Sequence, residues 1–398
     1  MQAKKYQLAN YEARKLHKID VPAFALKNPK KWEPDFLNLV LGQYTFLEKL
    51  KQKLPEWAHT EGLLGAQSVN IEQSSSSETA LEKFSPYSGK TALDLTGGYG
   101  IDSFFLTKKF DKIVYCEPHK ELFDIVDHNF DLLNLSGIRR INTTAEDFLI
   151  QNQSRFDLIF IDPDRRKETN SKLVLIEECS PNLLDIREHL CSVSPTILIK
   201  YSPLLDIHRA IIQLKTVSSV KIIAVNNEVK ELLFELKPVP SESVTLEAVN
   251  LKGSGKEIFT FKLKEEAEAM ATYAQPQDYL YEPNAAILKS GAFKTISARL
   301  QIKKLAQHSH FYTSEQIKTD FPGRIFKVHE VMTPNGKNLK KFKNQKVNVI
   351  SRNYPQKTVT LRQKYTLNDG GDDYLIFTQN HKNEKIVISC TRIFDLNT

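Results

Sequence analysis

Cysteine is scarce in this sequence, and long apolar runs are missing from it. The four cysteines (Cys116, Cys179, Cys191 and Cys390) show no CxxC spacing, which argues against both a zinc site and a disulfide framework. No apolar run approaches the roughly 18 residues of a membrane span, and the opening residues lack the apolar segment of a signal peptide. We therefore expect a cytoplasmic protein with no bound metal and no membrane partner.

Acidic residues are absent from one long segment late in the chain. The 398 residues carry a formal charge of +7, yet residues 276–398 hold 20 Lys and Arg against 10 Asp and Glu. No acid stands between Val331 and Asn368. We call residues 337–364 the basic segment; its nine basic residues are Lys337, Lys340, Lys341, Lys343, Lys346, Arg352, Lys357, Arg362 and Lys364. Such a segment indicates either a polyanionic partner or merely a solvated basic face, and the sequence leaves both open.

The stretch from Ala92 to Leu106 predicts a strand, a glycine turn and a helix. Its first residues form a short apolar run interrupted only by Asp94, which is typical of a buried strand. Three glycines follow between Thr96 and Gly100, and apolar residues then recur at helical spacing. Glycine allows a ligand to approach the backbone closely in such βαβ units. The turn departs from the dinucleotide pattern because Ser103 stands where a third glycine is usual.

Two later apolar strands end on carboxylates. The strand from Lys112 reaches Glu117 about 20 residues after the turn, where a nucleotide ribose needs a hydrogen-bond acceptor. The run from Phe156 to Ile161 leads directly into the charged turn 162–166, Asp-Pro-Asp-Arg-Arg. These strand ends predict an α/β fold in which one nucleotide site lies at the edge of a parallel sheet.

Several further motifs carry a family resemblance over nearly the whole chain from about Lys53. They are Glu72-Gln73-x-Ser75-Ser76, the stretch 94–102, the turn 162–166, Lys200-Tyr-Ser-Pro-Leu-Leu-Asp206, Asn227-Glu-Val-Lys-Glu231, Tyr281-Glu-Pro-Asn284, Arg352-Asn-Tyr-Pro355 and the run 369–375. With them the sequence resembles class I methyltransferases that use S-adenosylmethionine, and among these a bacterial family with a THUMP-like C-terminal domain. THUMP domains proper bind structured RNA. The resemblance therefore implies an RNA methyltransferase that acts on tRNA or rRNA.

The resemblance also implies a three-part organisation. We expect an N-terminal helical domain (1–84), a Rossmann-like, seven-stranded class I methyltransferase domain (85–275) and a small α+β THUMP-like RNA-binding domain (276–398). Leucines and other apolar residues from Leu37 to Leu54, at spacings of three and four, predict a long helix that starts after Pro34-Asp35 and ends at Pro55. Ser77 or a neighbour is expected to cap a helix over 78–84. An antiparallel hairpin of residues 244–249 and 258–263 is expected to close the sheet.

Residues matching the family's cofactor motifs are expected to bind S-adenosylmethionine. In the methyltransferase arrangement an acid after the third strand lies beside the adenine amino group, and we prefer Asp147 to Glu146 for that place. The predicted cofactor-binding residues are Asp94, Thr96, Gly97, Gly98, Gly100, Asp102, Glu117, Glu146, Asp147 and Asp162.

The turn 162–166 is the predicted catalytic element, with Asp162, Pro163, Asp164 and Arg165 as its residues. It departs from the Asp/Asn-Pro-Pro-aromatic turn of amino-group methyltransferases and is similar to the Asp-Pro-x-Arg turns of enzymes that modify guanine ring nitrogens. Alternatively, the arginines only pair with neighbouring acids. The residues expected to contact substrate RNA are Gln73, Ser75, Ser76, Arg166, Lys200, Tyr201, Lys340, Lys341, Lys343, Arg352 and Arg362.

Three alternative functions stay open on the sequence. The first is a non-catalytic RNA-binding protein with a methyltransferase-like fold, and the second is a small-molecule methyltransferase. A nucleotide-dependent oxidoreductase is the third, and Ser103 argues against it. A cysteine nucleophile for pyrimidine chemistry is disfavoured because Cys179 follows Glu178 instead of proline or threonine.

Overall fold

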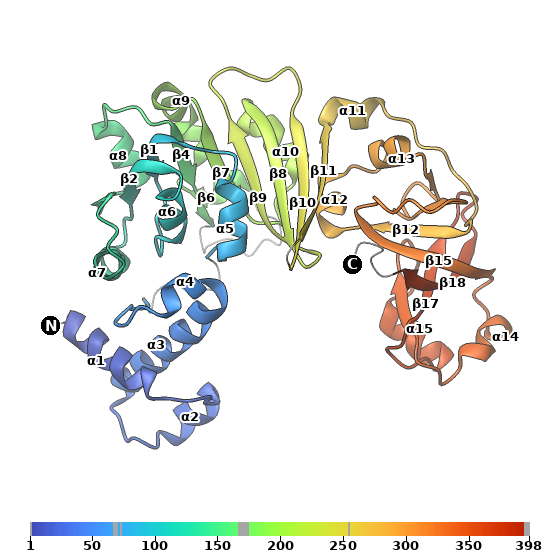
Figure 1. The fold of residues 1–398 in the computed structure, drawn as a ribbon, viewed down its shortest axis with the longest axis horizontal. Helices are drawn as coiled ribbons and strands as arrows, with labels where there is room; N and C mark the ends of the chain where they lie inside the picture. Colours follow the sequence, from blue (N-terminus) through green and yellow to red (C-terminus); the bar gives the residue numbers. More distant parts are fainter. Residues whose placement is uncertain (1, 67–70, 72–73, 166–174, 254, 394–398) are drawn as a thin grey trace. The chain divides into compact units, whose positions relative to one another are not determined.

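A computed structural model of the chain describes residues 2–66, 71, 74–165, 175–253 and 255–393 (Figure 1). No helix within these ranges is both long enough and apolar enough to cross a membrane.

The chain divides into two compact units, which we describe separately. The N-terminal unit comprises residues 1–218 and 231–241, and the C-terminal unit comprises residues 219–230 and 242–398. Two strands, β8 (Val217–Val225) and β9 (Glu228–Leu236), contribute residues to both units.

The N-terminal unit begins with helices and continues as an α/β domain. Helix α3 (Pro34–Lys53) buries one face, including Leu37, Val40, Tyr44 and Leu47, as its apolar spacing predicted. Helices α1 and α2 pack on it (Figure 1). The helices are α1 (Gln2–Arg14), α2 (Val21–Lys27), α3 (Pro34–Lys53), α4 (Pro55–Ala58), α5 (Ser77–Phe84), α6 (Ile101–Leu106), α7 (Lys120–Leu132), α8 (Ala145–Gln151), α9 (Leu183–Val193) and α10 (Ile207–Leu214).

The large sheet is arranged around β1. Its order is β11-β10-β8-β9-β7-β4-β1-β2-β3, and β1 pairs in parallel with both β2 and β4. The strand order therefore reverses at β1, and ligands of such sheets bind beyond the carboxyl ends of the strands at this point. The remaining bounds in this unit are β1 (Gly89–Asp94), β2 (Phe110–Cys116), β3 (Ile138–Ile141), β4 (Leu158–Ile161), β5 (Asp164–Arg165), β6 (Cys179–Ser180) and β7 (Ile197–Tyr201).

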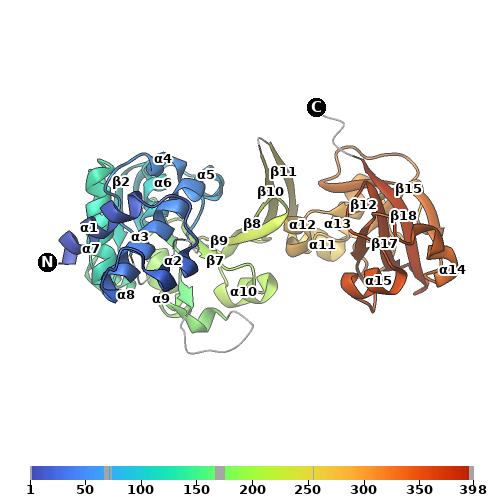
Figure 2. The ribbon, with the colours of Figure 1, turned by 90° about the horizontal axis from the view of Figure 1, so that it is seen from below.

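The C-terminal unit contains a second sheet of seven strands. Its order is β13-β14-β12-β15-β18-β17-β16, and helix α15 lies against it (Figure 2). Separate apolar clusters include Leu361 with Phe377, and Phe311 with Ile388. The elements are β10 (Thr245–Lys252), β11 (Gly255–Lys262), α11 (Leu263–Glu268), β12 (Tyr279–Pro283), α12 (Ala285–Ser290), α13 (Thr295–Leu300), β13 (Lys303–Lys304), β14 (Tyr312–Ser314), β15 (Gly323–Met332), α14 (Gly336–Leu339), β16 (Asn348–Ser351), α15 (Thr358–Tyr365), β17 (Asp373–Gln379) and β18 (Lys385–Ile393).

The α/β fold class is confirmed, but the end of the large sheet differs from the prediction. The hairpin of β10 and β11 forms and is antiparallel, yet the strand that runs antiparallel to β7 is β9. Asn226 and Asn227 have φ values of 49° and 67° and form a two-residue turn after β8. This turn returns the chain as β9 between β7 and β8, so that β10 and β11 extend the sheet to nine strands.

One predicted helix starts later than expected. From the sequence alone, residues 173–191 are expected to be mostly helical. In the structure, α9 begins only at Leu183. Pro181 precedes it, and the Asn182 side chain accepts a hydrogen bond from the Leu184 amide as the N-cap. Part of the predicted range, residues 173 and 174, lies outside the described residues.

Candidate active site at the carboxyl edge of the sheet

The loop between β1 and α6 begins with a buried carboxylate. Asp94 accepts hydrogen bonds from the Ser103 hydroxyl at 2.7 Å and from the Thr96 amide at 3.2 Å. Burial raises the pKa of Asp94 to about 7, although the Ser103 hydroxyl opposes this. Ser103, which replaces the third glycine of the dinucleotide pattern, thus anchors the loop through Asp94.

The three glycines of this loop serve different purposes. A Cβ on Gly97 would lie 2.0 Å from Tyr115 Cε2, and one on Gly100 would lie 2.2 Å from Phe130 Cζ. Gly98 has a φ of +51°, and a Cβ at this residue would lie 3.9 Å from its nearest neighbour, the Thr96 carbonyl oxygen. We expected all three to admit a ligand, but packing of aromatic rings accounts for Gly97 and Gly100. Of the three, only Gly98 has no atom of the described residues, its chain neighbours aside, within 3.8 Å of the place that a Cβ would take, and in this sense it faces open space.

Glu117 follows β2 and lies beside the same loop. One carboxylate oxygen accepts from the Gly98 amide at 3.0 Å, and the other accepts from the His119 amide at 2.8 Å. Burial raises the pKa of Glu117 despite these two donors. A carboxylate can accept about four hydrogen bonds, so Glu117 retains acceptor capacity toward a ligand at Gly98.

Asp162 is held at the end of β4 by partners from two neighbouring strands. Its amide donates to the Thr96 hydroxyl at 2.6 Å, and its carboxylate lies 2.5 Å from Lys200 Nζ at the end of β7. Burial raises the pKa of Asp162, and Lys200 counteracts that rise. For Lys200, burial favours a lower pKa, but Asp162, Asp102 and Glu231 outweigh it and raise the pKa. Lys200 therefore stays charged.

The rest of the turn 162–166 is only partly described. Pro163 is buried and Asp164 is exposed, and β5 pairs Asp164 with Ser180 on β6. The side chain of Arg165 and all of Arg166 lie outside the described residues. Asp164 therefore presents an exposed carboxylate next to the half-buried Asp162.

A buried lysine, which the sequence analysis did not select, links this site to helix α5. Lys83 has no solvent exposure and donates to Asp102 at 2.6 Å and to the Ser75 hydroxyl at 2.7 Å. Its Nζ also lies 3.2 Å from Glu231 Oε2, and Ser75 donates to the other oxygen of Glu231 at 2.8 Å. We call Ser75, Lys83, Asp102 and Glu231 the buried ion cluster.

Two lysines oppose the negative charge of the buried ion cluster: Lys83, which belongs to it, and Lys200, which lies beside it. Burial favours a raised pKa for Glu231, but Lys83 and Lys200 outweigh it and lower the pKa. Lys83 lies on the buried face of α5 with Ala80 and Phe84. A lysine on an otherwise apolar helix face is rarely buried without a partner, and this sequence signal could have indicated the buried ion cluster. Asp102 was expected to bind cofactor; in the structure its carboxylate pairs with Lys83, and the cofactor role stays a prediction.

Four predicted residues have other roles or surroundings. Glu146 and Asp147 are exposed at the start of α8, where the Thr144 hydroxyl donates to the Asp147 carboxylate at 2.9 Å. Ser76 caps α5 by accepting from the Thr79 amide, which confirms the predicted cap next to Ser77. Tyr201 is buried with its ring 5.8 Å from Phe234, and among the described residues its hydroxyl has no partner. Gln73 lies outside the described residues.

Several residues of the basic segment are neutralised by acids from outside it. Lys341 pairs with Glu330, Arg362 pairs with Asp369, and Arg352 lies 2.7 Å from Glu282. Lys337, Lys340, Lys343, Lys346, Lys357 and Lys364 are exposed, and within the described ranges they form no ion pair. The predicted basic surface therefore consists mainly of these six lysines.

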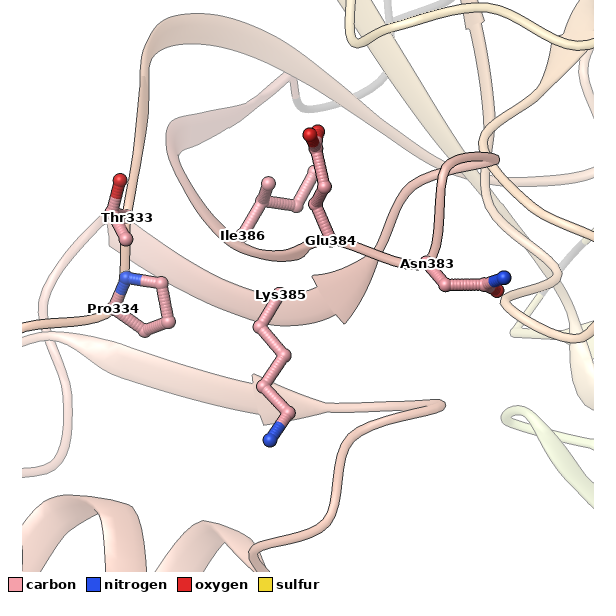
Figure 3. A pocket seen from close by; sticks show the side chains of 6 residues that line it. All are labelled: Thr333, Pro334, Asn383, Glu384, Lys385 and Ile386. Atoms are coloured by element: carbon pink, nitrogen blue, oxygen red, sulfur yellow. The ribbon is translucent and has the colours of Figure 1, made fainter.

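An open depression of about 660 Å³ lies elsewhere in the C-terminal unit (Figure 3). It is lined by Thr333, Pro334, Asn383, Glu384, Lys385 and Ile386. Glu384 and Lys385 point to different sides of the strand (Figure 3). Because the carboxylate of Glu384 and the ammonium group of Lys385 do not point toward a common place, this depression offers no catalytic arrangement.

Comparisons with known proteins agree with this architecture. Family models match residues 279–322 as a ferredoxin-like domain and residues 323–392 as a THUMP-like domain. The crystal structure of a "putative methyltransferase" from Porphyromonas gingivalis W83 is 30% identical, covers 98% of this chain and 99% of its own, and has a TM-score of 0.87.

More distant comparisons add little. A "putative RNA methyltransferase" from Pyrococcus horikoshii is 12% identical, covers 48% of this chain and 98% of its own, and has a TM-score of 0.34, which is too low to carry an argument. No curated protein matches the sequence. The chain belongs to the family of the Porphyromonas gingivalis protein, in which a methyltransferase fold is joined to a THUMP-like C-terminal domain, as the motifs predicted.

Proposed function

We propose that this chain is an S-adenosylmethionine-dependent methyltransferase that acts on a base of tRNA or rRNA. The observation that carries the proposal is the charge of the site at the carboxyl edge of the sheet. In the described part of the chain, Asp94 is influenced by the charges of Asp102 and Asp162. The cations that act on Asp102, Asp162 and Glu231 there are Lys83 and Lys200, so these described side chains comprise four acids and two lysines. An excess of carboxylates suits a cationic ligand.

This charge distinguishes two ligands that Rossmann-like folds bind. A dinucleotide brings an anionic pyrophosphate, which a group of carboxylates would repel. S-adenosylmethionine brings a sulfonium and an ammonium group, and it supplies an electrophilic methyl group when bound. The chain's residues fit it: Gly98 leaves open space beside the loop, and Glu117 retains acceptors for a ribose.

The chain's contribution to the reaction is mainly positioning. Transfer to a guanine ring nitrogen that carries hydrogen forms the C–N bond, breaks the C–S bond of the sulfonium and releases one proton, for which a carboxylate at this turn is the proposed acceptor. Alignment of the nitrogen with the methyl group supplies most of the rest of the rate. Asp162 is fixed by Thr96 and Lys200, and we assign to the exposed Asp164 next to it the acceptance of a hydrogen bond from the base. We propose Asp162, Pro163, Asp164 and Arg165 as the element that orients a guanine ring nitrogen.

We expect Asp164→Ala to slow methyl transfer by about a hundredfold, because a misplaced base loses alignment. Its affinity for S-adenosylmethionine and its melting temperature should stay unchanged, since Asp164 is exposed. Single-turnover transfer assays measure the rate, and Glu188→Ala, another exposed acid, serves as the control. A wild-type rate for Asp164→Ala on the true substrate would remove this residue from the proposal.

RNA is the proposed substrate because of the THUMP-like domain and the exposed lysines of the basic segment. We expect Lys337→Gln, Lys340→Gln and Lys343→Gln together to reduce the log–log salt slope of RNA affinity by about 2, at roughly 0.7 per phosphate contact on single strands. Anisotropy over a salt series measures the slope. Lys341→Gln with Arg362→Gln should change it less, because Glu330 and Asp369 already neutralise these residues. Equal slopes for all three proteins would favour the solvated basic face.

The substrate itself is identified by mass spectrometry of nucleosides. RNA from cells with and without the gene should differ in one methylated nucleoside, and the wild-type gene should restore it whereas Asp164→Ala should not. If every methylated nucleoside persists in cells without the gene, a small-molecule substrate or a non-catalytic role replaces the proposal.

A further inference from the structure

Within the C-terminal unit, the loop between β13 and β14 lies against the turn that follows β16. The Asn353 side chain donates to the Ser309 hydroxyl at 3.2 Å, and the Arg352 guanidinium lies 5.3 Å from the centre of the Phe311 ring. Ser309 is fully buried and donates to the Gln379 carbonyl at 2.8 Å. His310, between Ser309 and Phe311, is therefore held beside Arg352.

Two buried nitrogens at this place have no hydrogen-bond partner among the described residues. Arg352 directs Nη2 to Glu282 at 2.7 Å, but its Nη1 is buried and unpartnered. The His310 ring stacks on Phe293 at 3.7 Å between centres, and its buried Nδ1 is unpartnered as well. Leaving such groups without partners is costly, and an unmatched group in a native fold calls for an explanation.

The charged groups that act most strongly on His310 among the described residues are basic. Burial is the main reason that the pKa of His310 falls to about 4, and the neighbouring Lys304, Arg352 and His308 lower it further. Lys304 is itself buried and donates to the Gln307 carbonyl at 3.0 Å.

The nearby acids are already engaged. Glu282 accepts from both Arg324 and Arg352, and Glu266 accepts from the Lys294 and Thr295 amides. Glu282 thus opposes part of the Arg352 charge but leaves Nη1 without a partner, and an anion that reached both Nη1 and His310 Nδ1 would give each nitrogen an acceptor.

We propose that Arg352 Nη1 and His310 Nδ1 form a binding site for one phosphate group, and that the backbone of the substrate RNA supplies it. The assignment of RNA rests on the proposed function, whereas the phosphate site does not. A guanidinium binds phosphate better than a lysine does because its planar fork matches two oxygens. Arg352 opens the Arg-Asn-Tyr-Pro motif that carried part of the family resemblance, and this site gives the motif a role.

Nuclear magnetic resonance of histidine side chains in the full-length protein tests the site. Inorganic phosphate and, separately, an RNA oligonucleotide without terminal phosphates are titrated into protein labelled at histidine. The His310 signal, identified from its loss in His310→Asn, should shift with both probes. Asparagine is chosen because His310 has φ of 52°, a conformation that asparagine tolerates.

Two arginine variants separate the phosphate site from the ion pair. Arg352→Gln and Arg324→Gln each remove one partner of Glu282, but only the first removes the unpartnered nitrogen. We expect Arg352→Gln to weaken RNA binding about tenfold or more and to abolish the phosphate-induced shift of His310. Arg324→Gln should preserve that shift.

The outcomes distinguish the possible errors. A His310 signal that phosphate and RNA both leave unmoved would overturn the site. A shift with inorganic phosphate alone would overturn the assignment to RNA and indicate a free or terminal phosphate. Equal effects of the two arginine variants would mean that only the Glu282 pair matters, and the site would again be overturned. Failure of methyl transfer, in contrast, would leave the phosphate response intact.

Discussion

Gly98→Asn should greatly weaken the binding of S-adenosylmethionine while the protein still folds. We expect the Kd to rise by about a hundredfold or more, which corresponds to a loss of roughly 2.7 kcal/mol of binding free energy. A side chain at this position enters open space next to the loop, where we place the ligand. Asparagine tolerates the φ of +51° better than other side chains do. The fold is therefore expected to persist while the binding space is filled.

The neighbouring glycines provide matched controls. Gly97→Ala and Gly100→Ala would place a Cβ 2.0 Å from the Tyr115 ring and 2.2 Å from the Phe130 ring, far inside van der Waals contact. Such overpacking typically costs about 1–3 kcal/mol of stability or more. Calorimetry with the cofactor and thermal unfolding are measured on all three variants. If Gly98→Asn binds as tightly as the wild type, the ligand does not lie beside this loop.

Lys83→Met should lower the free energy of unfolding by about 3–5 kcal/mol at neutral pH, which is the usual cost of removing one partner from a buried ion pair. Methionine fills a similar volume, so the loss is mainly electrostatic. Without Lys83, the carboxylates of Asp102 and Glu231 stay near Asp162, and in the described part of the chain Lys200 is the cation that still acts on all three. Chemical denaturation of both proteins measures the difference.

The destabilisation should depend on pH in a defined direction. Because Lys83 and Lys200 lower the pKa of Glu231 in the folded state, its stabilising contribution is present above the unfolded pKa of about 4.3 and is lost as the pH falls below it. In Lys83→Met the carboxylates should protonate at higher pH, so the difference between the proteins should shrink on acidification. Adding Glu231→Gln should restore part of the stability. A loss below about 1 kcal/mol at neutral pH would argue against the buried ion cluster.

Local sequence patterns predicted most elements of the fold correctly. The apolar spacing of α3, the cap of α5 and the strands leading to Asp94, Glu117 and Asp162 all depend on neighbouring residues, which the sequence displays directly. The position of β9 could not be predicted in this way, because it depends on how the turn at Asn226 and Asn227 directs the chain within the sheet.

The candidate site was predicted only in part, because part of it depends on contacts between residues that are distant in the sequence. The buried ion cluster joins Ser75 and Lys83 to Asp102 and Glu231, which are far apart in the chain, and single-residue patterns do not reveal such pairings. The absence of acids from the basic segment was likewise misleading, since acids outside it reach Lys341, Arg352 and Arg362 through the fold.

Transfer of a labelled methyl group from S-adenosylmethionine to RNA tests the central claim most directly. Purified full-length protein is incubated with the labelled cofactor and with total RNA from cells that lack the gene, and the label in precipitated RNA is counted. We predict incorporation into RNA from these cells, little incorporation into RNA from cells that carry the gene, and about a hundredfold less with Asp164→Ala. Absence of label from RNA, in a protein shown by calorimetry to bind the cofactor, would contradict the proposal that RNA is the substrate.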